Sequence, residues 1–478
     1  MNDHKVRFVH KGKTIGIDLT KEKISPTTTV LRFLRENSGC HGTKEGCAEG
    51  DCGACTVVLG ESDKSGKMQY SAVDSCLLFL PMLHGKQLIT VEDLSEEGKL
   101  HPVQQAMVDC NGTQCGYCTP GFVMSLLALK KQAGSATHED IEDALTGNLC
   151  RCTGYRPIIE AAESALKNKL PDSFDHNAKA TAELLDAIPK EQHLEITTHT
   201  QRYFRPATIE EAVRLKAIHP ELILFSGATD LALRVTKRHE VLTDLLDLSG
   251  IESLKSLSIT EKDITIGSGC SLETIRTRLK KELPALTGIL DVFGSRQIRS
   301  LATLGGNLGS ASPIGDTLPV LMAYEAKVRL TSLHGQRTIP MSDFITGYRT
   351  TVRTQEELIT HIIIPIPDQD LFIRSYKVSK RRDLDISTLS GAFRLRTHDG
   401  LVKDALLAFG GMAAKTERAL AAEEFLIGKP WSQENAETAA ELVRKHFHPI
   451  SDARSGAAFR QTVSGNLILK FWHDSKNR

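Results

Sequence analysis

The spacing of apolar and polar positions changes along the first ninety residues, and each change predicts an element. Residues 6–9 and 14–19 alternate between apolar and polar side chains around a short polar turn, which is typical of a β-hairpin. Residues 27–36 carry apolar side chains at helical spacing, and residues 56–59 form an apolar run typical of a strand. The pattern therefore predicts a hairpin, a short helix, a long polar loop and a further strand.

Beyond residue 90 the pattern becomes helical. Residues 103–110 form one candidate helix, and Thr119-Pro120 would open another, with threonine as the N-cap and proline at the first helical position. Residues 137–140 form a variant capping box, which predicts the start of a third helix. We therefore expect a helical region up to about residue 170.

The second half of the chain alternates between helical and strand patterns. Residues 208–215 predict a helix with a capping-box start, and residues 222–225 a buried strand. Strands such as 405–410 precede helices such as 435–445. The predicted division is 1–90, 91–170, a polar linker at 171–200, then 201–370 and 371–478.

Composition narrows the class of protein. A length of 478 residues suggests about three domains, and 40% hydrophobic residues suffice for buried cores. Lys plus Arg and Asp plus Glu are equal at 59 each, which gives no support for binding nucleic acid or anionic membranes. The charged N-terminus does not resemble a signal peptide, and no run is long and apolar enough to span a membrane. We therefore expect a cytoplasmic protein, whose 11 cysteines serve as metal or redox ligands rather than disulfides.

Four cysteines between residues 47 and 76 have a diagnostic spacing. Cys47, Cys52 and Cys55 form a C-x4-C-x2-C series, and Cys76 follows after a long interval. This is the plant-type spacing of a [2Fe–2S] cluster. A zinc site is the alternative, but zinc prefers paired knuckles that close a tetrahedron, which this series fits poorly.

A second group of four cysteines lies in the predicted helical region. Its members are Cys115, Cys118, Cys150 and Cys152, in a C-x2-C and C-x-C arrangement. This spacing is less diagnostic, and zinc remains an alternative to a second cluster. The other three cysteines are expected to be small buried apolar residues: Cys40, Cys110 and Cys270.

Two glycine-containing segments are candidate phosphate-binding loops. One covers residues 224–231 after a predicted strand, and the other covers residues 303–307. Glycine-rich loops expose backbone N–H groups that hold pyrophosphate, although each segment alone also fits an ordinary tight turn. Neither segment follows the G-x-G-x-x-G pattern, so a Rossmann domain for a nicotinamide cofactor is not predicted.

Three blocks that surround the cysteines, residues 42–55, 114–121 and 148–155, resemble the molybdenum hydroxylases. This is the family of xanthine dehydrogenase, aldehyde oxidase and carbon monoxide dehydrogenase. The resemblance implies an α+β multidomain fold. Its parts would be a β-grasp ferredoxin-like [2Fe–2S] domain, an all-α [2Fe–2S]-binding domain, an α+β FAD-binding domain and a small α+β C-terminal domain. The flavin domain would be of the vanillyl-alcohol-oxidase and carbon monoxide dehydrogenase flavoprotein type.

The same resemblance implies the residues that bind each cofactor. The metal ligands would be Cys47, Cys52, Cys55, Cys76, Cys115, Cys118, Cys150 and Cys152. The FAD diphosphate would be cradled by Leu224, Phe225, Ser226, Gly227, Ala228, Thr229, Asp230, Leu231, Thr303, Leu304, Gly305, Gly306 and Asn307. Phe293 would lie against the isoalloxazine ring, and the pocket would be completed by Asp316, Ile359 and Lys377. Gln114 would bind the pterin of a molybdenum cofactor held by a partner.

The function that this resemblance implies is an electron relay. The chain would be the small subunit of a bacterial xanthine dehydrogenase, bound to a separate large molybdopterin subunit, with two copies of each. Electrons from xanthine or hypoxanthine would pass through the second cysteine set, then the first, to FAD and NAD+. Two alternatives remain: the equivalent subunit of a hydroxylase acting on aldehydes, nicotinate or another N-heterocycle, and a zinc-bound assembly protein without enzymatic activity.

Overall fold

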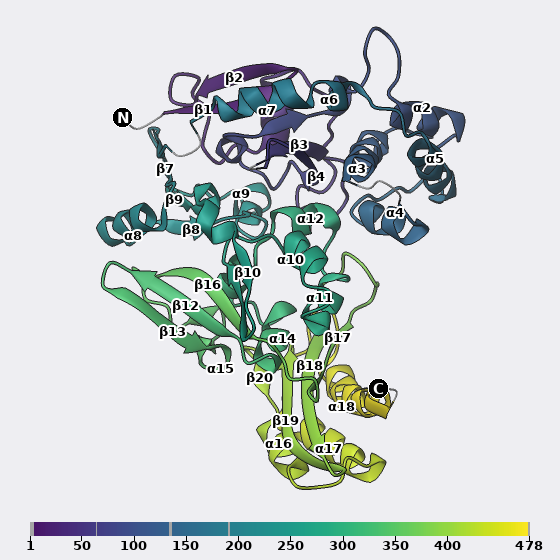
Figure 1. Cartoon of the computed structure of the whole chain (residues 1–478), viewed down its shortest axis with the longest axis vertical. Coiled ribbons are helices and arrows are strands. Elements are labelled where there is room, and N and C mark those ends of the chain that lie inside the picture. The colour runs from purple at the N-terminus through teal and green to yellow at the C-terminus, as the bar shows by residue number, and fades with distance from the viewer. Residues whose placement is uncertain (1–3, 64, 133–135, 190–191, 477–478) are drawn as a thin grey trace. The chain divides into compact units, whose positions relative to one another are not determined.

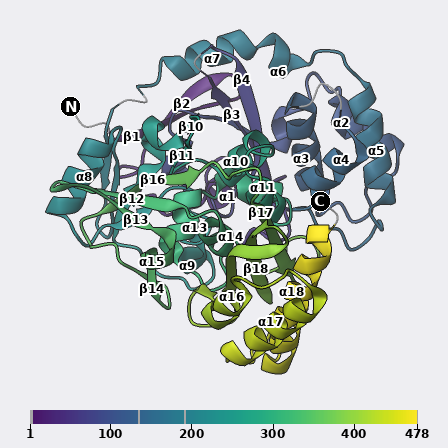
Figure 2. The same ribbon diagram turned by 60° about the horizontal axis from the view of Figure 1, so that its bottom comes forward.

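The computed structural model describes residues 4–63, 65–132, 136–189 and 192–476. The chain divides into two compact units, whose elements are labelled in Figures 1 and 2. The first unit comprises residues 1–212, 221–252 and 295–302, and the second comprises residues 213–220, 253–294 and 303–478. Within the described ranges, no helix combines the length and the apolar character needed to cross a bilayer.

A five-stranded sheet in the order β2-β1-β5-β3-β4 forms the N-terminal part of the first unit. Its strands are β1 (Lys5–His10), β2 (Lys13–Asp18), β3 (Thr56–Ser62), β4 (Met68–Asp74) and β5 (Gln87–Ile89). The predicted hairpin is confirmed, since β1 and β2 pair antiparallel from Lys5 opposite Asp18 to His10 opposite Lys13. The predicted helix is α1 (Val30–Glu36), which begins after the N-cap Thr29.

The two faces of this sheet are covered by different elements because neighbouring strand residues point to opposite sides. Phe8 and Val57 pack in one apolar cluster with the buried face of α1. Val9 and Val58 pack in another cluster with apolar residues of α3 and α7. The sheet is therefore buried on both faces, and it fixes the loops that leave β3 and β4.

Four helices form the predicted helical region of the first unit (Figure 1). They are α2 (Pro102–Asp109), α3 (Thr119–Gln132), α4 (His138–Leu145) and α5 (Arg156–Lys167). The predicted capping box at Thr137 and Asp140 is present at the start of α4. Phe122 and Ile158 are completely buried where these helices pack together.

The segment predicted as a polar linker contains regular structure. It holds α6 (Ser173–His176), α7 (Ala178–Asp186) and β6 (Leu194–Thr197). Ala182 and Leu185 on α7, together with Ile188, pack against the first sheet and helix α3. Only a few small apolar residues lie among many polar ones here, so the helical period was too weak to recognise.

A second sheet of the first unit has the order β6-β7-β9-β8. Its remaining strands are β7 (Arg202–Arg205), β8 (Ile223–Phe225) and β9 (Asp244–Asp247). The helices and short 3-10 turns that accompany the two sheets are η1 (Leu80–Leu83), η2 (Val91–Asp93), α9 (Ala232–Thr236), η3 (Leu248–Gly250) and α12 (Arg296–Leu301). The turn η4 (Glu252–Lys255) begins at the last residue of the segment 221–252 and continues into the second unit. Helix α8 (Ile209–Ile218) confirms the helix predicted near residue 208. Because residues 295–302 belong to this unit, α12 packs with the N-terminal part of the chain.

The second unit contains an antiparallel sheet in the order β10-β11-β16-β12-β13 and a four-stranded sheet β17-β18-β19-β20. The strands of the first sheet are β10 (Leu257–Ile259), β11 (Asp263–Gly267), β12 (Lys327–Ser332), β13 (Gly335–Pro340) and β16 (Leu358–Pro365), and β14 (Ile345–Gly347) pairs with β15 (Thr350–Thr351). The strands of the other sheet are β17 (Phe372–Val378), β18 (Leu389–His398), β19 (Leu401–Gly410) and β20 (Glu417–Arg418).

Eight helices of the described residues complete the second unit. They are α10 (Leu272–Arg278), α11 (Pro284–Leu290), α13 (Leu304–Ser310), α14 (Thr317–Ala323), α15 (Met341–Phe344), α16 (Leu420–Leu426), α17 (Gln433–His446) and α18 (Ala457–Lys476). Helices α17 and α18 lie side by side in both views (Figures 1 and 2). Phe393, Phe409 and Phe471 form the aromatic centre between these helices and β17–β19, with ring centroids 5.0 Å and 5.5 Å apart.

A buried ion-pair group fastens the start of the segment 171–200 to the helical region. Asp172 accepts a hydrogen bond from His101 Nε2 at 2.9 Å and pairs with Lys131. The side chains of all three are at most 7% exposed. Burial alone would raise the pKa of Asp172, but the hydrogen bonds from His101 and Lys131 outweigh it and hold this pKa below its usual range.

We predict that Asp172→Asn destabilises the first unit by about 3 kcal/mol, because it leaves the buried Lys131 ammonium without its main partner. Since the folded pKa of Asp172 is depressed, its contribution is present above the unfolded pKa of about 4 and is lost as the pH falls through the folded pKa. The difference in the free energy of unfolding between the parent protein and Asp172→Asn should be largest at neutral pH and should shrink in acid.

Urea unfolding at about pH 7 and about pH 4, followed by circular dichroism, measures this difference. The exposed Glu183 on α7 provides a matched control, and Glu183→Gln should stay within about 0.5 kcal/mol of the parent protein. Equal effects of the two substitutions would contradict the role of Asp172.

Candidate metal and cofactor site

The first cysteine set lies in the loop before β3 and just after β4. Cys55 and Cys76 are both buried, and their Sγ atoms are 3.4 Å apart. Cys47 and Cys52 form the second pair and are half-buried. The pKa of Cys47 is lowered to about 5, first by the hydrogen bond from the side chain of Cys52 and then by backbone N–H groups. The loop is therefore built to stabilise a thiolate.

Backbone N–H groups supply part of that stabilisation. Those of Glu49 and Asp51 donate to Cys47 Sγ at 3.4 Å and 3.3 Å. Gly50 and Gly53 have φ values of 78° and 65°, which let the loop curl with its amides directed inward. Such amides stabilise negative charge on sulfur and tune the potential of a bound cluster.

The second cysteine set lies at the start of α3 and before α5. The Sγ atoms of Cys115 and Cys152 are 3.7 Å apart, and both residues are exposed. Cys118 and Cys150 are half-buried. Burial, followed by the neighbouring Cys150, raises the pKa of Cys118 to about 12. One pair of thiols is thus open to solvent, whereas the other pair faces the helices.

Tyr155 and Thr153 hold the loop of the second set. Burial alone would raise the pKa of Cys150, but hydrogen bonds from the Thr153 hydroxyl, 3.2 Å from Sγ, and from backbone amides outweigh it and lower this pKa. The backbone N–H of Cys150 donates to the Tyr155 hydroxyl at 3.0 Å. Tyr155 has a φ of 68°, in the left-handed region that bulky residues rarely adopt.

Both cysteine sets fit binuclear clusters. All 11 cysteines are free thiols. In the part of the chain that the structure describes, no group of three or more His, Cys, Asp or Glu side chains is arranged to hold a single metal ion. Each set instead consists of two thiol pairs, as two iron ions that each take two thiolates require. The donor sets therefore suit [2Fe–2S] clusters better than the zinc alternative.

The two cysteine loops are hydrogen-bonded to each other. The backbone N–H of Leu149 donates to the carbonyl oxygen of Cys52 at 3.0 Å. The side-chain amide of Asn148 donates to the carbonyl oxygen of Gly53 at 3.1 Å. Leu149 directly precedes Cys150, a candidate ligand of the second set. Cys52, a candidate ligand of the first set, is therefore hydrogen-bonded to the residue next to Cys150.

Close packing of backbone accompanies these hydrogen bonds. A Cβ atom on Gly53 would lie 2.2 Å from the carbonyl oxygen of Gly147, and one on Gly121 would lie 2.1 Å from the carbonyl oxygen of Gly53. The Tyr117 hydroxyl also donates to the carbonyl oxygen of Glu45. The loops can meet this closely only because the facing positions are glycines.

Sequence reasoning missed two ionisable groups beside the first set, Asp74 and Lys237. Asp74 is completely buried, and burial raises its pKa to about 8. Cys55 Sγ donates to its Oδ1 at 3.6 Å, and its Oδ2 has no hydrogen-bond partner among the described residues. Lys237 donates to the carbonyl oxygen of Cys47 at 3.0 Å. The position of Asp74 two residues before Cys76 was the available signal, whereas Lys237 is remote in sequence.

The predicted segment Leu224–Leu231 lies in the first unit. Leu224 and Phe225 end strand β8, and the segment continues to the start of α9. Gly227 approaches the chain so closely that a Cβ atom would lie 1.8 Å from the carbonyl oxygen of Leu301. Ala228 has a φ of 59°, a constrained conformation often found at ligand sites.

The predicted glycine loop at Thr303–Asn307, in the second unit, is a helix start. Thr303 is the N-cap of α13, and its Oγ1 accepts a hydrogen bond from the backbone N–H of Gly306 at 3.1 Å. A Cβ atom on Gly305 would lie 2.4 Å from the Cβ of Ser268. The ordinary tight turn that the sequence left open as an alternative is not formed, since these glycines begin a helix, and close packing explains Gly305. The role of the segment at FAD stays a prediction.

Three other predicted flavin residues, Phe293, Asp316 and Lys377, are linked to one another and to Asn307 in the second unit. Lys377 Nζ lies 3.1 Å from Asp316 Oδ2, with both side chains 5% exposed, and donates to the carbonyl oxygen of Val292 at 2.9 Å. Val292 directly precedes Phe293, which is half-buried. Asn307 accepts a hydrogen bond from the hydroxyl of Thr317, the residue after Asp316.

Two predicted residues stand apart from that group. Ile359, on β16, is 8% exposed, and its Cδ1 would lie 3.5 Å from a Cβ atom on Gly309 of α13. Gln114 is exposed in the first unit and directly precedes the exposed Cys115. Its side chain therefore lies at the open edge of the second cysteine set.

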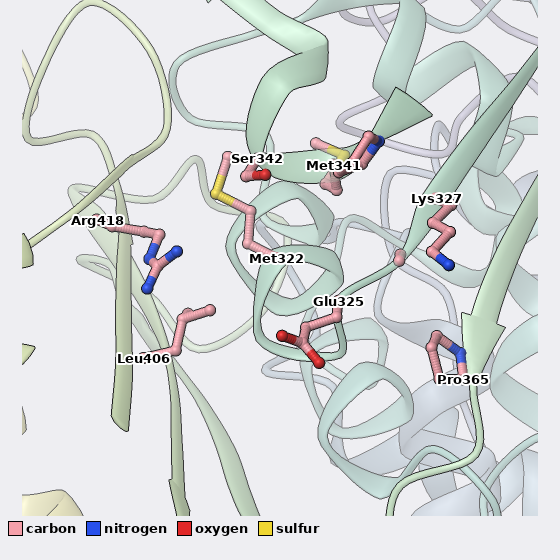
Figure 3. Close-up of a pocket in the computed structure, with 10 residues that line it drawn as sticks. Met322, Glu325, Lys327, Met341, Ser342, Pro365, Leu406 and Arg418 are labelled. Carbon is pink, nitrogen blue, oxygen red and sulfur yellow. The ribbon is translucent and has the colours of Figure 1, made fainter. Parts of the chain in front are cut away.

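A cavity of about 340 Å³ in the second unit lies away from all these residues (Figure 3). It is lined by Met322, Glu325, Ala326, Lys327, Pro340, Met341, Ser342, Pro365, Leu406 and Arg418, and it includes none of the predicted residues. Arg418 is paired with Glu423 at 2.6 Å, and Glu325 with Arg394 at 3.0 Å.

Four family models match the chain. A 2Fe-2S iron-sulfur cluster binding domain covers residues 14–79, and a [2Fe-2S] binding domain covers residues 90–163. An FAD binding domain in molybdopterin dehydrogenase covers residues 196–367. A CO dehydrogenase flavoprotein C-terminal domain covers residues 374–475. These matches confirm the predicted α+β multidomain fold class, with two iron–sulfur domains and a flavin domain; the predicted boundaries remain predictions.

Curated relatives match over nearly the whole chain. The xanthine dehydrogenase/oxidase of Mus musculus is 31% identical, over 98% of this chain and 39% of the mouse protein. The xanthine dehydrogenase of Emericella nidulans is also 31% identical, over 99% of this chain and 39% of that protein. The chain therefore spans about two fifths of the length of these relatives.

Solved structures give the same fold for part of the chain. A carbon monoxide dehydrogenase chain from Hydrogenophaga pseudoflava has a TM-score of 0.54 and 24% identity, over 56% of this chain and 94% of that one. Quinoline 2-oxidoreductase from Pseudomonas putida 86 has a TM-score of 0.53 with the same identity and coverage. At this identity the likeness supports the fold alone.

We predict that Gly121→Ala disrupts both cysteine loops. Alanine is the better helix former, but its Cβ would meet the carbonyl oxygen of Gly53 at 2.1 Å, so the backbone has to move. We expect a loss of about 1–3 kcal/mol of stability and a fall in bound iron and acid-labile sulfide from about four of each per chain.

Iron and sulfide analysis with thermal unfolding measures both effects. The control is Gly288→Ala in α11, an exposed helical glycine whose added Cβ would meet no heavy atom within 4 Å. It should leave the iron content unchanged. Full iron loading and unchanged stability of Gly121→Ala would contradict the close approach of the loops.

Proposed function

We propose that this chain, a member of the molybdenum hydroxylase family with two iron–sulfur domains and a flavin domain, is the electron-transfer subunit of a xanthine dehydrogenase. The observation that carries this proposal is the direct hydrogen bond from Leu149 to the carbonyl oxygen of Cys52. It joins two cysteine loops that each present two thiol pairs. Such a contact brings the two sets of thiols close together, as transfer of single electrons between them requires, whereas two separate zinc sites in an assembly protein need no such proximity.

Different residues of the chain have different roles in such a relay. When bound, the two [2Fe–2S] clusters carry single electrons, and FAD exchanges single electrons for a two-electron transfer. We assign the cluster ligands to the two cysteine sets already described. Backbone amides at Cys47 and the hydroxyl of Thr153 at Cys150 stabilise the thiolates. The bonded path from Cys150 through Leu149 to Cys52 shortens the distance an electron has to cross.

The order of transfer follows from exposure. Cys115 and Cys152 are exposed, so this set is suited to receive electrons from outside the chain. Cys55 and Cys76 are buried, so the first set is suited to an intermediate position. We therefore propose that electrons enter through the second set and leave through the first set toward FAD.

The surface around the second set supports a molybdopterin-binding partner subunit. Four large apolar or aromatic side chains are 40–55% exposed there, on or beside the cysteine loops: Val108, Tyr117, Leu149 and Tyr155. Exposed aromatic and apolar residues are typical of protein interfaces. Gln114 at the same edge is suited to donate to a pterin held by this partner. A complex with two copies of each subunit remains our expectation.

For FAD, we propose the residues predicted from sequence, taken separately in each unit. In the first unit, the segment Leu224–Leu231 offers a constrained backbone around Gly227 and Ala228. In the second unit, the buried Lys377 is held by Asp316 and by the carbonyl oxygen of Val292. A buried ammonium stabilises a nearby anion, so Lys377 suits an anionic group of the cofactor. The part of the FAD site in the second unit would also include Phe293, Ile359 and residues Thr303–Asn307.

The choice of substrate and acceptor comes from the relatives. Several proteins named xanthine dehydrogenase are about 31% identical over nearly the whole chain, which favours xanthine or hypoxanthine and NAD+. The second candidate is the same relay in a hydroxylase for an aldehyde, nicotinate or another N-heterocycle. The neighbouring quinoline 2-oxidoreductase keeps that alternative open.

We predict that xanthine bleaches the visible absorption of the native complex and that NAD+ restores it. The reason is that electrons released by the substrate fill the clusters and flavin of this chain and are removed by the acceptor. The complex is purified with its partner and mixed anaerobically with xanthine, an aldehyde, nicotinate or quinoline in parallel. Bleaching by one of the other compounds but not by xanthine would reject the xanthine assignment and keep the relay.

We also predict that Cys150→Ser separates the two ends of the relay. Substrate should no longer reduce the flavin, because the second set loses a ligand, whereas NADH should still reduce it directly. Stopped-flow absorption with each reductant measures the two rates. Cys110→Ser, at a cysteine outside both sets, should change neither rate. If Cys150→Ser abolished reduction by NADH as well, the proposed order would be wrong.

A further inference from the structure

A glutamine on helix α12 reaches the place where the cysteine loops meet. Gln297 is completely buried, although α12 belongs to the sequence of the flavin domain. Its Nε2 donates to Asn148 Oδ1 at 3.0 Å and to Ser125 Oγ at 2.9 Å, and it lies 3.4 Å from the carbonyl oxygen of Ala144. A helix 149 residues away in sequence thus contacts the second cysteine loop.

Asn148 links the two loops through both ends of its amide. Its Nδ2 donates to the carbonyl oxygen of Gly53 at 3.1 Å and lies 3.3 Å from Thr56 Oγ1, on the side of the first set. Its Oδ1 accepts hydrogen bonds from Ser125 and Gln297 on the other side. The orientation of this amide therefore decides whether Gly53 meets a donor or an acceptor.

Gln297 supports the orientation that the Gly53 carbonyl also requires. The amide of Gln297 is itself oriented by the carbonyl oxygen of Ala144, which accepts from Nε2, whereas its Oε1 has no hydrogen-bond partner among the described residues. A side-chain amide can be turned over with almost no change in shape, so only its hydrogen-bond partners fix it. The Ser125 hydroxyl can donate or accept and so allows both orientations. The Nε2 of Gln297 can only donate, so it requires the oxygen of Asn148. The reversed amide would place two NH2 groups against each other and an oxygen against the carbonyl of Gly53.

We propose that Gln297 is a positioning residue for electron transfer between the two cysteine sets, an inference that rests on the proposed relay. Together with Gly53 and Ser125, it fixes the amide of Asn148 and so supports the hydrogen bond of the adjacent Leu149 N–H to the carbonyl oxygen of Cys52. With both clusters bound, this step would oxidise the cluster of the second set by one electron and reduce that of the first by one electron. Gln297 would hold the two loops in contact and would take no part in the electron exchange itself.

A separate contact keeps α12 in place without Gln297. Arg299 is 1% exposed, and its Nη2 donates to Asp143 Oδ1 on α4 at 2.6 Å. This pair anchors the same helix to the same helical region, but it does not involve Asn148. Arg299→Met is therefore a matched control, because it removes a buried polar contact of α12 without removing the donor to Asn148.

The test compares Gln297→Met with Arg299→Met in the full complex with its clusters. Methionine preserves the volume of glutamine but removes the donor. Electron transfer between the clusters is followed by rapid-freeze electron paramagnetic resonance after a pulse of reductant. We expect Gln297→Met to slow it roughly tenfold, since displacements of about 1 Å at reacting centres cost up to about a hundredfold. Arg299→Met should stay within about twofold of the parent protein.

Two further readouts do not depend on enzyme activity. The magnetic interaction between the two reduced clusters should weaken in Gln297→Met, and hydrogen exchange at the Leu149 amide should become roughly tenfold faster, about 1.4 kcal/mol of lost protection. Should Gln297→Met fail to bind its iron, Gln297→Asn serves instead, because its shorter amide cannot reach Asn148.

The outcomes separate the inference from the relay. Unchanged transfer and unchanged Leu149 exchange in the Gln297 variants would overturn the inference and leave the relay intact. Equal slowing in Arg299→Met would also overturn it, because loosening of α12 would then explain the effect. Absence of transfer between the clusters in the unsubstituted protein would instead reject the relay, and Leu149 exchange would still decide whether Gln297 positions the loop.

Discussion

The contact between two cysteine loops depends on the absence of side chains at a few positions. A Cβ atom on Gly53 would overlap the carbonyl oxygen of Gly147, and one on Gly121 would overlap that of Gly53. A Cβ atom on Gly147 would overlap the side-chain amide of Gln297. Only without these atoms can Leu149 donate to Cys52 and Asn148 to Gly53. Elements on both sides are fixed first by burial, with the sheet enclosed on both faces and the helices packed around Phe122. The rigid surrounding structure therefore sets the distance between the two loops.

Electrostatics then distinguish the two sets. The first set is enclosed with a buried carboxyl, Asp74, and a cation, Lys237, at its edge. In the second set, one pair of thiols is open to solvent, and its loop is held by a tyrosine hydroxyl. The surroundings of a cluster tune its potential through charge, hydrogen bonds and exposure, so unlike surroundings suit a directed transfer. Within the second unit, the buried Lys377–Asp316 pair shows the same use of a fixed charge in an enclosed place.

The sequence was most informative where chemistry is local. Spacing alone grouped Cys47, Cys52 and Cys55, and the hairpin and capping-box patterns located their elements. Packing between distant segments could not be predicted from the sequence. The weak period of α7 concealed a helix, and the glycines after Thr303, predicted to form a phosphate-binding loop, did not reveal that they begin α13. Gln297, Asp74 and Lys237 carry no local motif, so only the fold brings them to the cysteine loops.

The remoteness of Gln297 also bears on how the protein is made. Its hydrogen bond to Asn148 spans 149 residues, so the contact between the loops stays incomplete until the ribosome has passed α12. Contacts of such long range form late, because a long loop has to close before any interaction compensates for it. The second cysteine loop therefore receives its last side-chain hydrogen bond only from residues that are synthesised as part of the flavin domain.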